Sequence, residues 1–145
     1  MKSLRIIVDL DNTLVDEFGR QVRPGMVEFL EALGADGHQL ILWTSSTGQR
    51  ARAILAEHDL ERHFGRLICR EDYDDSGPKN IAEIGGQAII DDDPAQTDAA
   101  TASGALGLLI TAYRGGPDPK PGELDEILKR IRRLAGPGFR GWFGR

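Results

Sequence analysis

The sequence predicts an α/β domain with a mostly parallel central sheet and helices on both faces. Two observations lead to this fold class. Short apolar runs rich in Val, Ile and Leu alternate along the 145 residues with longer segments of helical periodicity, which is the pattern of successive strand–helix units. Several of the apolar runs also end in Asp, Thr or Ser, and parallel strands gather such endings at one edge of a sheet.

The first strand is the apolar run of residues 4–8, which is followed at once by the carboxylates Asp9 and Asp11. The run is continuously apolar, as expected of a strand buried on both faces. Two acids at a buried strand end repel each other and lose hydration, so they persist where a cation or a proton transfer requires them. Residues 16–23 then hold Gly19 between extended residues, which predicts a small hairpin or flap.

The first helix is predicted to follow the flap. Pro24 suits the first position of this helix, and Val27, Leu30 and Leu33 form an apolar stripe at helical spacing. Gly34 is predicted to end the helix, because glycine is the favoured residue just beyond a helix C-terminus.

The second strand is predicted over residues 39–43, which are followed by the hydroxyl residues Thr44, Ser45 and Ser46. Ser46 and Gln49 have the spacing of a capping box, in which each side chain satisfies a backbone N–H at the start of a helix. The second helix is therefore predicted to begin at this point.

The second half of the chain continues the alternation. Residues 64–69 predict a short third strand, and the polar residues 70–77 predict a loop. Pro78 and Lys79 are predicted to open a short helix. Residues 88–90 form the fourth apolar run and predict a fourth strand.

The fourth strand ends in a second pair of acids, Asp91 and Asp92. Asp93 is predicted to shape the turn before Pro94 and not to bind metal. An Ala-rich helix to about Ser103 should follow this turn.

A last strand is predicted over residues 106–111 and an amphipathic helix over residues 124–134. The domain is therefore expected to span residues 1–135. Residues 136–145 form a Gly-, Arg- and aromatic-rich tail, including Arg140 and Trp142, for which packing or disorder is favoured over binding of a partner.

The bulk composition limits the classes of function. A net charge of −5 argues against broad binding to nucleic acid or to an anionic membrane, since both require a positive surface. No run of residues approaches the length of a membrane span, and no signal peptide precedes the first strand, so a cytoplasmic protein is expected. The single Cys69 lies in an apolar run and is interpreted as a core residue.

The polar strand endings predict one site at the carboxyl edge of the sheet. Acids suit a hard cation such as Mg²⁺, and a hydroxyl and a lysine suit phosphoryl oxygens. A carboxylate can also attack phosphorus, so these groups together predict phosphoryl transfer. The three histidines have no partners in sequence and are interpreted as surface or structural residues, and the absence of a His/Cys ligand cluster argues against zinc. The residues expected at this edge are Asp9, Asp11, Thr44, Ser45, Lys79, Asp91 and Asp92.

These motifs, in this order, resemble the haloacid dehalogenase (HAD) superfamily of aspartyl-phosphate phosphatases. The resemblance covers about residues 4–112, nearly the whole predicted sheet. Four motifs in order, each at a predicted strand end or helix start, make coincidence remote. The matches are residues 9–13 for the first motif, 43–45 for the second, Lys79 for the third and 89–92 for the fourth.

Residues 23–30 and 42–46 are further similar to the NIF/FCP-like phosphatases of that superfamily. The resemblance implies a three-layer, Rossmann-like fold. The intervals between Asp11, Thr44 and Lys79 are already filled by predicted flap, helices and strands, so no cap domain is expected. A site without a cap would be open to large substrates.

The resemblance also implies roles for individual residues. Asp9 would attack phosphorus and carry the phosphoryl group, and Asp11 would act as general acid and then as general base. Thr44 would bind the phosphoryl group, and Lys79 would neutralise its charge and hold Asp9. Mg²⁺ would be bound by Asp9, the backbone carbonyl of Asp11, and Asp92 directly or Asp91 through water. The other predicted substrate contacts are Ser45 and, from the flap, Arg20 and Arg23.

The sequence thus predicts a Mg²⁺-dependent phosphomonoester phosphatase whose partner is a phosphorylated substrate. The substrate class stays open between a small molecule, a phosphoprotein and a polynucleotide end, as does a homo-oligomeric state. Alternatives are a phosphotransferase and a catalytically weak regulatory protein of the same fold. A phospho-receiver domain is excluded, because Lys79 precedes the second acid pair, Asp91 and Asp92, whereas receivers place the lysine last.

Overall fold

A computed structural model describes residues 1–137 and contains one five-stranded sheet in which every strand pair is parallel. The strand order is β3-β2-β1-β4-β5. The predicted α/β class with a Rossmann-like sheet is therefore confirmed, and β1 lies at the centre. The strands are β1 (Arg5–Val8), β2 (Gln39–Trp43), β3 (Arg66–Ile68), β4 (Ala88–Asp91) and β5 (Leu106–Leu109).

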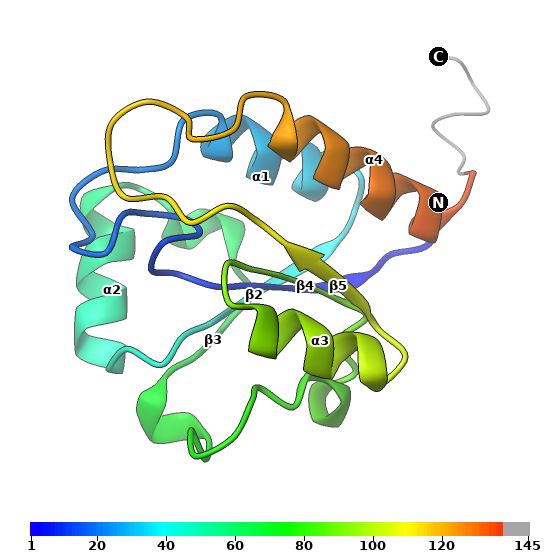
Figure 1. Ribbon diagram of the computed structural model, residues 1–145, viewed down its shortest axis with the longest axis horizontal. Coiled ribbons are helices and arrows are strands. Elements are labelled where there is room, and N and C mark those ends of the chain that lie inside the picture. The colour runs from blue at the N-terminus through cyan, green and yellow to red at the C-terminus, as the bar shows by residue number, and fades with distance from the viewer. Residues whose placement is uncertain (138–145) are drawn as a thin grey trace.

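Helices cover both faces of the sheet (Figure 1). The helices α1 (Met26–Ala35), α2 (Gly48–Glu57) and α4 (Glu123–Ala135) contribute side chains to the core on one face. The helix α3 (Pro94–Ala102) and the 3₁₀ helix η3 (Ile81–Ile84) pack on the other face. Two further 3₁₀ turns are η1 (Glu61–His63) and η2 (Arg70–Asp72).

The alternation of side chains along β1 divides the core between these two faces. Ile6 and Val8 belong to the cluster beneath α1, α2 and α4, whereas Ile7 belongs to the cluster beneath α3. All three side chains are fully buried. Gly107 lets β5 approach α3 closely, because a Cβ atom there would lie 2.3 Å from the carbonyl oxygen of Thr97.

The boundaries predicted for α1 are wrong at both ends. Gly25, with a φ of 80°, caps the N-terminus of the helix, so Pro24 lies outside it. Gly34 lies inside the helix, and Asp36 follows as the C-terminal cap. The buried face of α1 therefore begins with Met26 and not with Val27, which is only half-buried. The buried residues of α1 are Met26, Phe29, Leu30 and Leu33.

The predicted capping box of α2 is also wrong. Thr47 caps this helix, and its hydroxyl accepts a hydrogen bond from the backbone N–H of Arg50 at 3.3 Å. The hydroxyl of Ser46 instead accepts from the side chain of Arg50 at 3.1 Å. Lys79 likewise precedes the 3₁₀ helix η3 by two residues and does not open it.

The predicted flap over residues 16–23 is present as a small turn closed by an antiparallel bridge between Val15 and Val22. The Asp16 carboxylate accepts hydrogen bonds from the backbone N–H of Arg20 at 2.7 Å and of Gln21 at 2.9 Å. The flap lies beside α2 (Figure 1), and the His58 ring is 2.8 Å from the carbonyl oxygen of Gly19. These bonds give the flap a defined shape.

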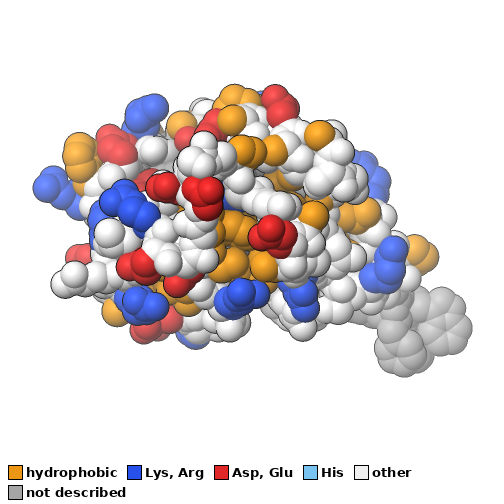
Figure 2. Space-filling view, turned by 90° about the horizontal axis from the view of Figure 1, so that it is seen from below, with side chains coloured by type: hydrophobic (Ala, Val, Ile, Leu, Met, Phe, Trp, Pro, Cys, Tyr) orange, Lys and Arg blue, Asp and Glu red, His pale blue; other side chains and the backbone are white. Residues whose placement is uncertain are grey.

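Acidic and basic side chains are interspersed on the face of the molecule that Figure 2 shows. No helix in the described part of the chain is long and apolar enough to cross a membrane. Of the tail predicted from residue 136 onward, residues 138–145 lie outside the described residues, and with them Arg140 and Trp142.

Candidate active site

The carboxyl ends of the two neighbouring central strands bring the acidic motifs together. In the sheet, Val8 of β1 lies opposite Ile90 of β4. The next residues, Asp9 and Asp91, are therefore adjacent, and the backbone N–H of Asp9 donates to the carbonyl of Ile90 at 3.1 Å. The convergence follows from parallel pairing alone, because equivalent positions in two parallel strands share one edge.

Lys79 joins these two acids. Its Nζ donates to Asp9 Oδ1 at 3.0 Å and to Asp91 Oδ2 at 2.8 Å. The side chains of Asp9, Lys79 and Asp91 are 12%, 5% and 2% exposed. Burial by itself would lower the pKa of Lys79, but the two carboxylates outweigh it and raise the pKa to about 12. Lys79 is therefore positively charged in this site.

Asp92 completes a cluster of three carboxylates with Asp9 and Asp91. One oxygen from each of the three lies within 4.8 Å of the others. Burial, reinforced by repulsion between the acids, raises the pKa of Asp9 and of Asp91 to about 6 despite the contact with Lys79. Burial also raises the pKa of Asp92. One lysine does not neutralise three carboxylates, so the donor set fits a hard divalent cation such as Mg²⁺.

The hydroxyl of Thr13 links the two ends of this cluster. Its Oγ1 lies 3.1 Å from Asp9 Oδ2 and 3.2 Å from Asp92 Oδ1, and Thr13 is fully buried. Both oxygens of Asp91 are engaged, by Lys79 and by the backbone N–H of Asp93 at 3.0 Å. Asp93 itself caps α3 through the N–H of Ala95, which confirms its predicted role in the turn.

Asp11 has a different environment, because its carboxylate is not part of the three-acid cluster that the described residues form. Both of its oxygens accept hydrogen bonds from Arg50, Oδ2 from Nη1 and Oδ1 from Nη2, each at 2.9 Å. Hydrogen bonding to Asp11 is the main cause that raises the pKa of Arg50 above its ordinary value. Arg50 is a site residue that the sequence analysis missed. Arg50 lies in the first turn of α2, shortly after Thr44, and this position in the sequence could have indicated that its side chain is near the site.

Thr44 and Ser45 follow β2 at the same edge of the sheet. Thr44 is 1% exposed, and its Oγ1 accepts a hydrogen bond from the backbone N–H of Ser46 at 3.0 Å. The hydroxyl hydrogen of Thr44 is not used in this bond. The side chain of Ser45 is exposed. The backbone carbonyl of Ser45 accepts a hydrogen bond from Nε of Arg70 at 2.8 Å.

The two flap arginines have unlike surroundings. Arg20 is exposed, with its guanidinium carbon 5.4 Å from the ring centroid of Phe18. Arg23 is 2% exposed and donates to the backbone carbonyls of Asn12, Thr13 and Thr111. The prediction that Arg23 contacts substrate is therefore wrong, since its guanidinium is used to hold the loop that follows β1.

His38, His58 and Cys69 lie outside this site and have structural surroundings. His38 accepts at Nδ1 from the backbone N–H of Leu4 at 3.0 Å, and His58 contacts the flap. Cys69 is fully buried. Near it, Glu71 and Asp72 accept hydrogen bonds from the backbone N–H groups of Gly48 and Cys69. These two acids thus serve local backbone structure.

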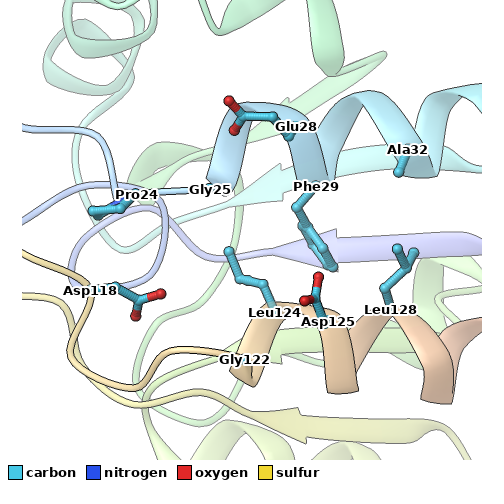
Figure 3. A pocket seen from close by; sticks show the side chains of 10 residues that line it. All are labelled: Pro24, Gly25, Glu28, Phe29, Ala32, Asp118, Gly122, Leu124, Asp125 and Leu128. Atoms are coloured by element: carbon cyan, nitrogen blue, oxygen red, sulfur yellow. The ribbon is translucent and has the colours of Figure 1, made fainter.

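A separate cavity of about 330 Å³ lies between α1 and α4 (Figure 3). Its apolar part is formed by Phe29, Leu124 and Leu128, and the acids Glu28 and Asp125 are also in its wall. The described residues that line it include none of the predicted site residues. The candidate site is therefore the polar edge of the sheet and not this cavity.

Comparison with known families finds a matching family model. A model described as NLI interacting factor-like phosphatase matches residues 4–138, which is nearly the whole chain. A search of curated proteins found no match.

Comparison with solved structures finds chains of the same fold. A hydrolase from Streptococcus pneumoniae superposes with a TM-score of 0.69 at 15% identity, over 89% of this chain and 100% of the other. A HAD-superfamily hydrolase from Ehrlichia chaffeensis superposes with a TM-score of 0.66 at 15% identity, over 92% of this chain and 98% of the other.

Proposed function

The chain belongs to the family of NLI interacting factor-like phosphatases, and from this premise we propose that it is a Mg²⁺-dependent phosphomonoester hydrolase that forms an aspartyl-phosphate on Asp9. It is a phosphatase of the HAD type without a cap. The observation that carries the proposal is the buried contact of Lys79 with Asp9 and Asp91 inside the three-acid cluster.

The metal ion would be held by Asp9, Asp92 and the backbone carbonyl of Asp11. The engagement of both Asp91 oxygens by Lys79 and Asp93 supports a water-mediated role for Asp91. When bound, Mg²⁺ supplies a positive charge to the phosphoryl oxygens. The excess of negative charge among the three acids supports this assignment.

Asp9 is the nucleophile in the proposed reaction. Lys79 and Thr13 hold its two oxygens, which fixes the direction of the carboxylate. One oxygen forms a bond to phosphorus while the bond from phosphorus to the ester oxygen breaks. Asp11 gives its proton to the departing alcohol. Water then attacks the phosphoryl group and gives a proton to Asp11, and the bond to Asp9 breaks to release phosphate.

Thr44 and Lys79 would contact the phosphoryl oxygens, with Ser45 at the exposed side of the same turn. Thr44 has a hydroxyl hydrogen to donate, and Lys79 carries the positive charge described above. Arg20 would contact the part of the substrate outside the phosphoryl group. The side chain of Asp11 is 31% exposed, which supports a site that admits large as well as small phosphorylated substrates.

Substitution of the nucleophile tests the proposal. The Asp9→Asn variant is expected to hydrolyse p-nitrophenyl phosphate at least about 10³-fold more slowly than the wild type in the presence of Mg²⁺, because an amide does not form the covalent intermediate. The exposed Asp98 on α3 offers a matched control, and Asp98→Asn should keep the wild-type rate.

Acid-quenched wild-type enzyme should also carry one phosphoryl group on the peptide that contains Asp9. An Asp9→Asn enzyme that kept a tenth or more of the wild-type rate would refute the proposed mechanism. A wild-type rate that was unchanged on removal of Mg²⁺ with a chelator would refute the metal requirement.

A further inference from the structure

We infer that Arg50 binds an anionic group on the alcohol part of the substrate, so that the enzyme favours phosphomonoesters whose leaving group carries a carboxylate or similar anion near the ester oxygen. The inference rests on the proposed function, in which Asp11 serves the leaving oxygen. The inference concerns the substrates that the site selects. Its basis is the set of four hydrogen bonds that the guanidinium group of Arg50 donates.

Arg50 is held in place independently of Asp11. Its Nη1 donates to the hydroxyl of Ser46 at 3.1 Å, and its Nη2 donates to the carbonyl of Glu17 at 3.2 Å. These partners come from the loop after β2 and from the flap. Each terminal nitrogen of Arg50 therefore has one structural bond and one bond to Asp11. Loss of the Asp11 bonds would leave the guanidinium anchored in the same position.

Asp11 must leave this arrangement to act on substrate. Both of its oxygens accept from Arg50 at 2.9 Å. To reach the leaving oxygen, the carboxylate has to turn away from at least one of the two N–H donors. The ion pair between Arg50 and Asp11 can break and form again, because an ion pair in contact with solvent is weak. The side chains of Arg50 and Asp11 are 38% and 31% exposed. When the carboxylate turns away from both donors, two parallel N–H groups of Arg50 face the site.

The direction of the reaction places the leaving group near these donors. Displacement at phosphorus proceeds in line, so the leaving oxygen lies opposite the attacking oxygen of Asp9. Asp9 belongs to the buried side of the site, as do Lys79 and Asp91. The leaving alcohol must therefore extend toward the exposed side, where Asp11 and Arg50 are found.

Charge explains why Arg50 would select an anion. The three-acid cluster repels a negatively charged leaving group, and Lys79 is already engaged with Asp9 and Asp91. A guanidinium with two parallel N–H donors matches the two oxygens of a carboxylate. The carboxylate of Asp11 already occupies this position, which indicates that the geometry suits such a group.

A pair of matched substrates tests the inference. 3-Carboxyphenyl phosphate and 3-carbamoylphenyl phosphate have the same shape, but only the first is anionic at the ring substituent. The wild type with Mg²⁺ is expected to have a kcat/KM at least about 10-fold higher for the carboxylate, the lower end expected of a charge-assisted hydrogen bond. The Arg50→Gln variant should have a ratio near 1, whatever its absolute rate. The ratio within one preparation does not depend on the fraction of folded enzyme.

Two further variants control the experiment. Arg50→Lys keeps the charge without the paired donors, so its ratio should fall between those of the wild type and Arg50→Gln. It also provides the decisive comparison if Arg50→Gln does not fold. Arg52 is exposed on the same helix, and Arg52→Gln should keep the wild-type ratio.

The outcomes separate this inference from the proposed function. A wild type that hydrolyses both esters at equal kcat/KM overturns the inference alone, and so does an Arg50→Gln variant that keeps the wild-type preference. A wild type that hydrolyses neither ester in the presence of Mg²⁺ overturns the proposed function and the inference together.

Discussion

At the scale of single residues, Lys79 differs most from an ordinary lysine. Its ammonium is buried, and it bridges two carboxylates at 3.0 and 2.8 Å. Such a buried pair contributes little net stability compared with apolar packing, because both charges have lost their hydration. Its removal is nevertheless harmful, because the remaining acids stay buried without a counter-charge. Lys79 therefore matters for stability as well as for the proposed chemistry.

The Lys79→Gln variant tests this role. In metal-free buffer near pH 8, it should lower the free energy of unfolding by about 3–5 kcal/mol, since Asp9 and Asp91 remain buried without a cation. Urea unfolding followed by circular dichroism measures the change. Lys120 is exposed, and Lys120→Gln should change the free energy by less than about 0.5 kcal/mol. Equal values for the two variants would contradict this account.

Most residues of the acidic cluster could be predicted from sequence, because parallel strand ends must meet. Asp9 and Asp91 each follow an apolar run, and the register of β1 and β4 places them side by side. Arg50 could not be predicted in the same way. Its guanidinium reaches Asp11 through a long side chain, and a helical pattern of apolar residues does not encode the direction of such a chain. The burial of Arg23 was missed for the same reason.

At the scale of structural elements, the flap is fixed to α2 and to the loop after β1. Gly19 allows this close packing, because its φ is 69° and a Cβ atom would lie 2.5 Å from Cδ1 of Ile54. The carbonyls of Glu17 and Gly19 also bond to Arg50 and His58. The flap is therefore a rigid side of the site, and the position of Arg50 depends on it.

Two glycine substitutions test the rigidity of this element. Gly19→Ala should lower the free energy of unfolding by at least about 1–2 kcal/mol, through the left-handed backbone and the contact with Ile54. Gly34 lies inside α1, and apart from its chain neighbours and the helix's own backbone no atom lies within 4 Å of the Cβ that alanine would add. Gly34→Ala should therefore raise the free energy of unfolding by about 0.5–1 kcal/mol. Denaturant unfolding distinguishes the two. The same sign of change in both variants would refute the analysis.

The elements themselves were predicted from sequence better than their ends. The boundaries of β2 match residue for residue, because an apolar run bounded by polar residues leaves little choice. At the start of α1, Pro24 and Gly25 compete for the turn, and the positive φ of the glycine delays the helix. At α2, Ser46 and Thr47 are both good caps. Contacts with Arg50 occupy the hydroxyl of Ser46, a circumstance that only tertiary structure reveals.

At the scale of the whole molecule, the buried carboxylates of Asp9 and Asp91 destabilise the folded, metal-free protein when they are deprotonated. The pKa values of Asp9 and Asp91 rise from 3.8 to about 6 on folding, mainly through burial. Between these values the folded protein binds more protons than the unfolded chain. The free energy of unfolding of the metal-free protein should therefore fall as pH rises from about 4 to about 6, with the full loss present above that range.

Mg²⁺ should reverse this loss, because it binds the deprotonated acids of the folded state. The rise in melting temperature between chelator and excess Mg²⁺ should be larger at about pH 8 than at about pH 5, where protons compete for the acids. Asp92→Asn should reduce the rise, and Asp98→Asn should retain it. A rise of the same size at both pH values would count against a metal site built from these carboxylates. Scanning calorimetry provides the measurement.

The hydrogen bonds of Arg23 and Asn12 extend the influence of the site beyond its own residues. Arg23 joins the loop after β1 to the carbonyl of Thr111, and the backbone N–H of Tyr113 donates to the carbonyl of Asn12 at 2.8 Å. The segment after β5 thus supports the loop that carries Asp9 and Asp11. Inactivating substitutions in a randomised library should consequently be found at Tyr113 as well as at the acids. A design that transfers the acidic motifs to another scaffold must include the segment after β5.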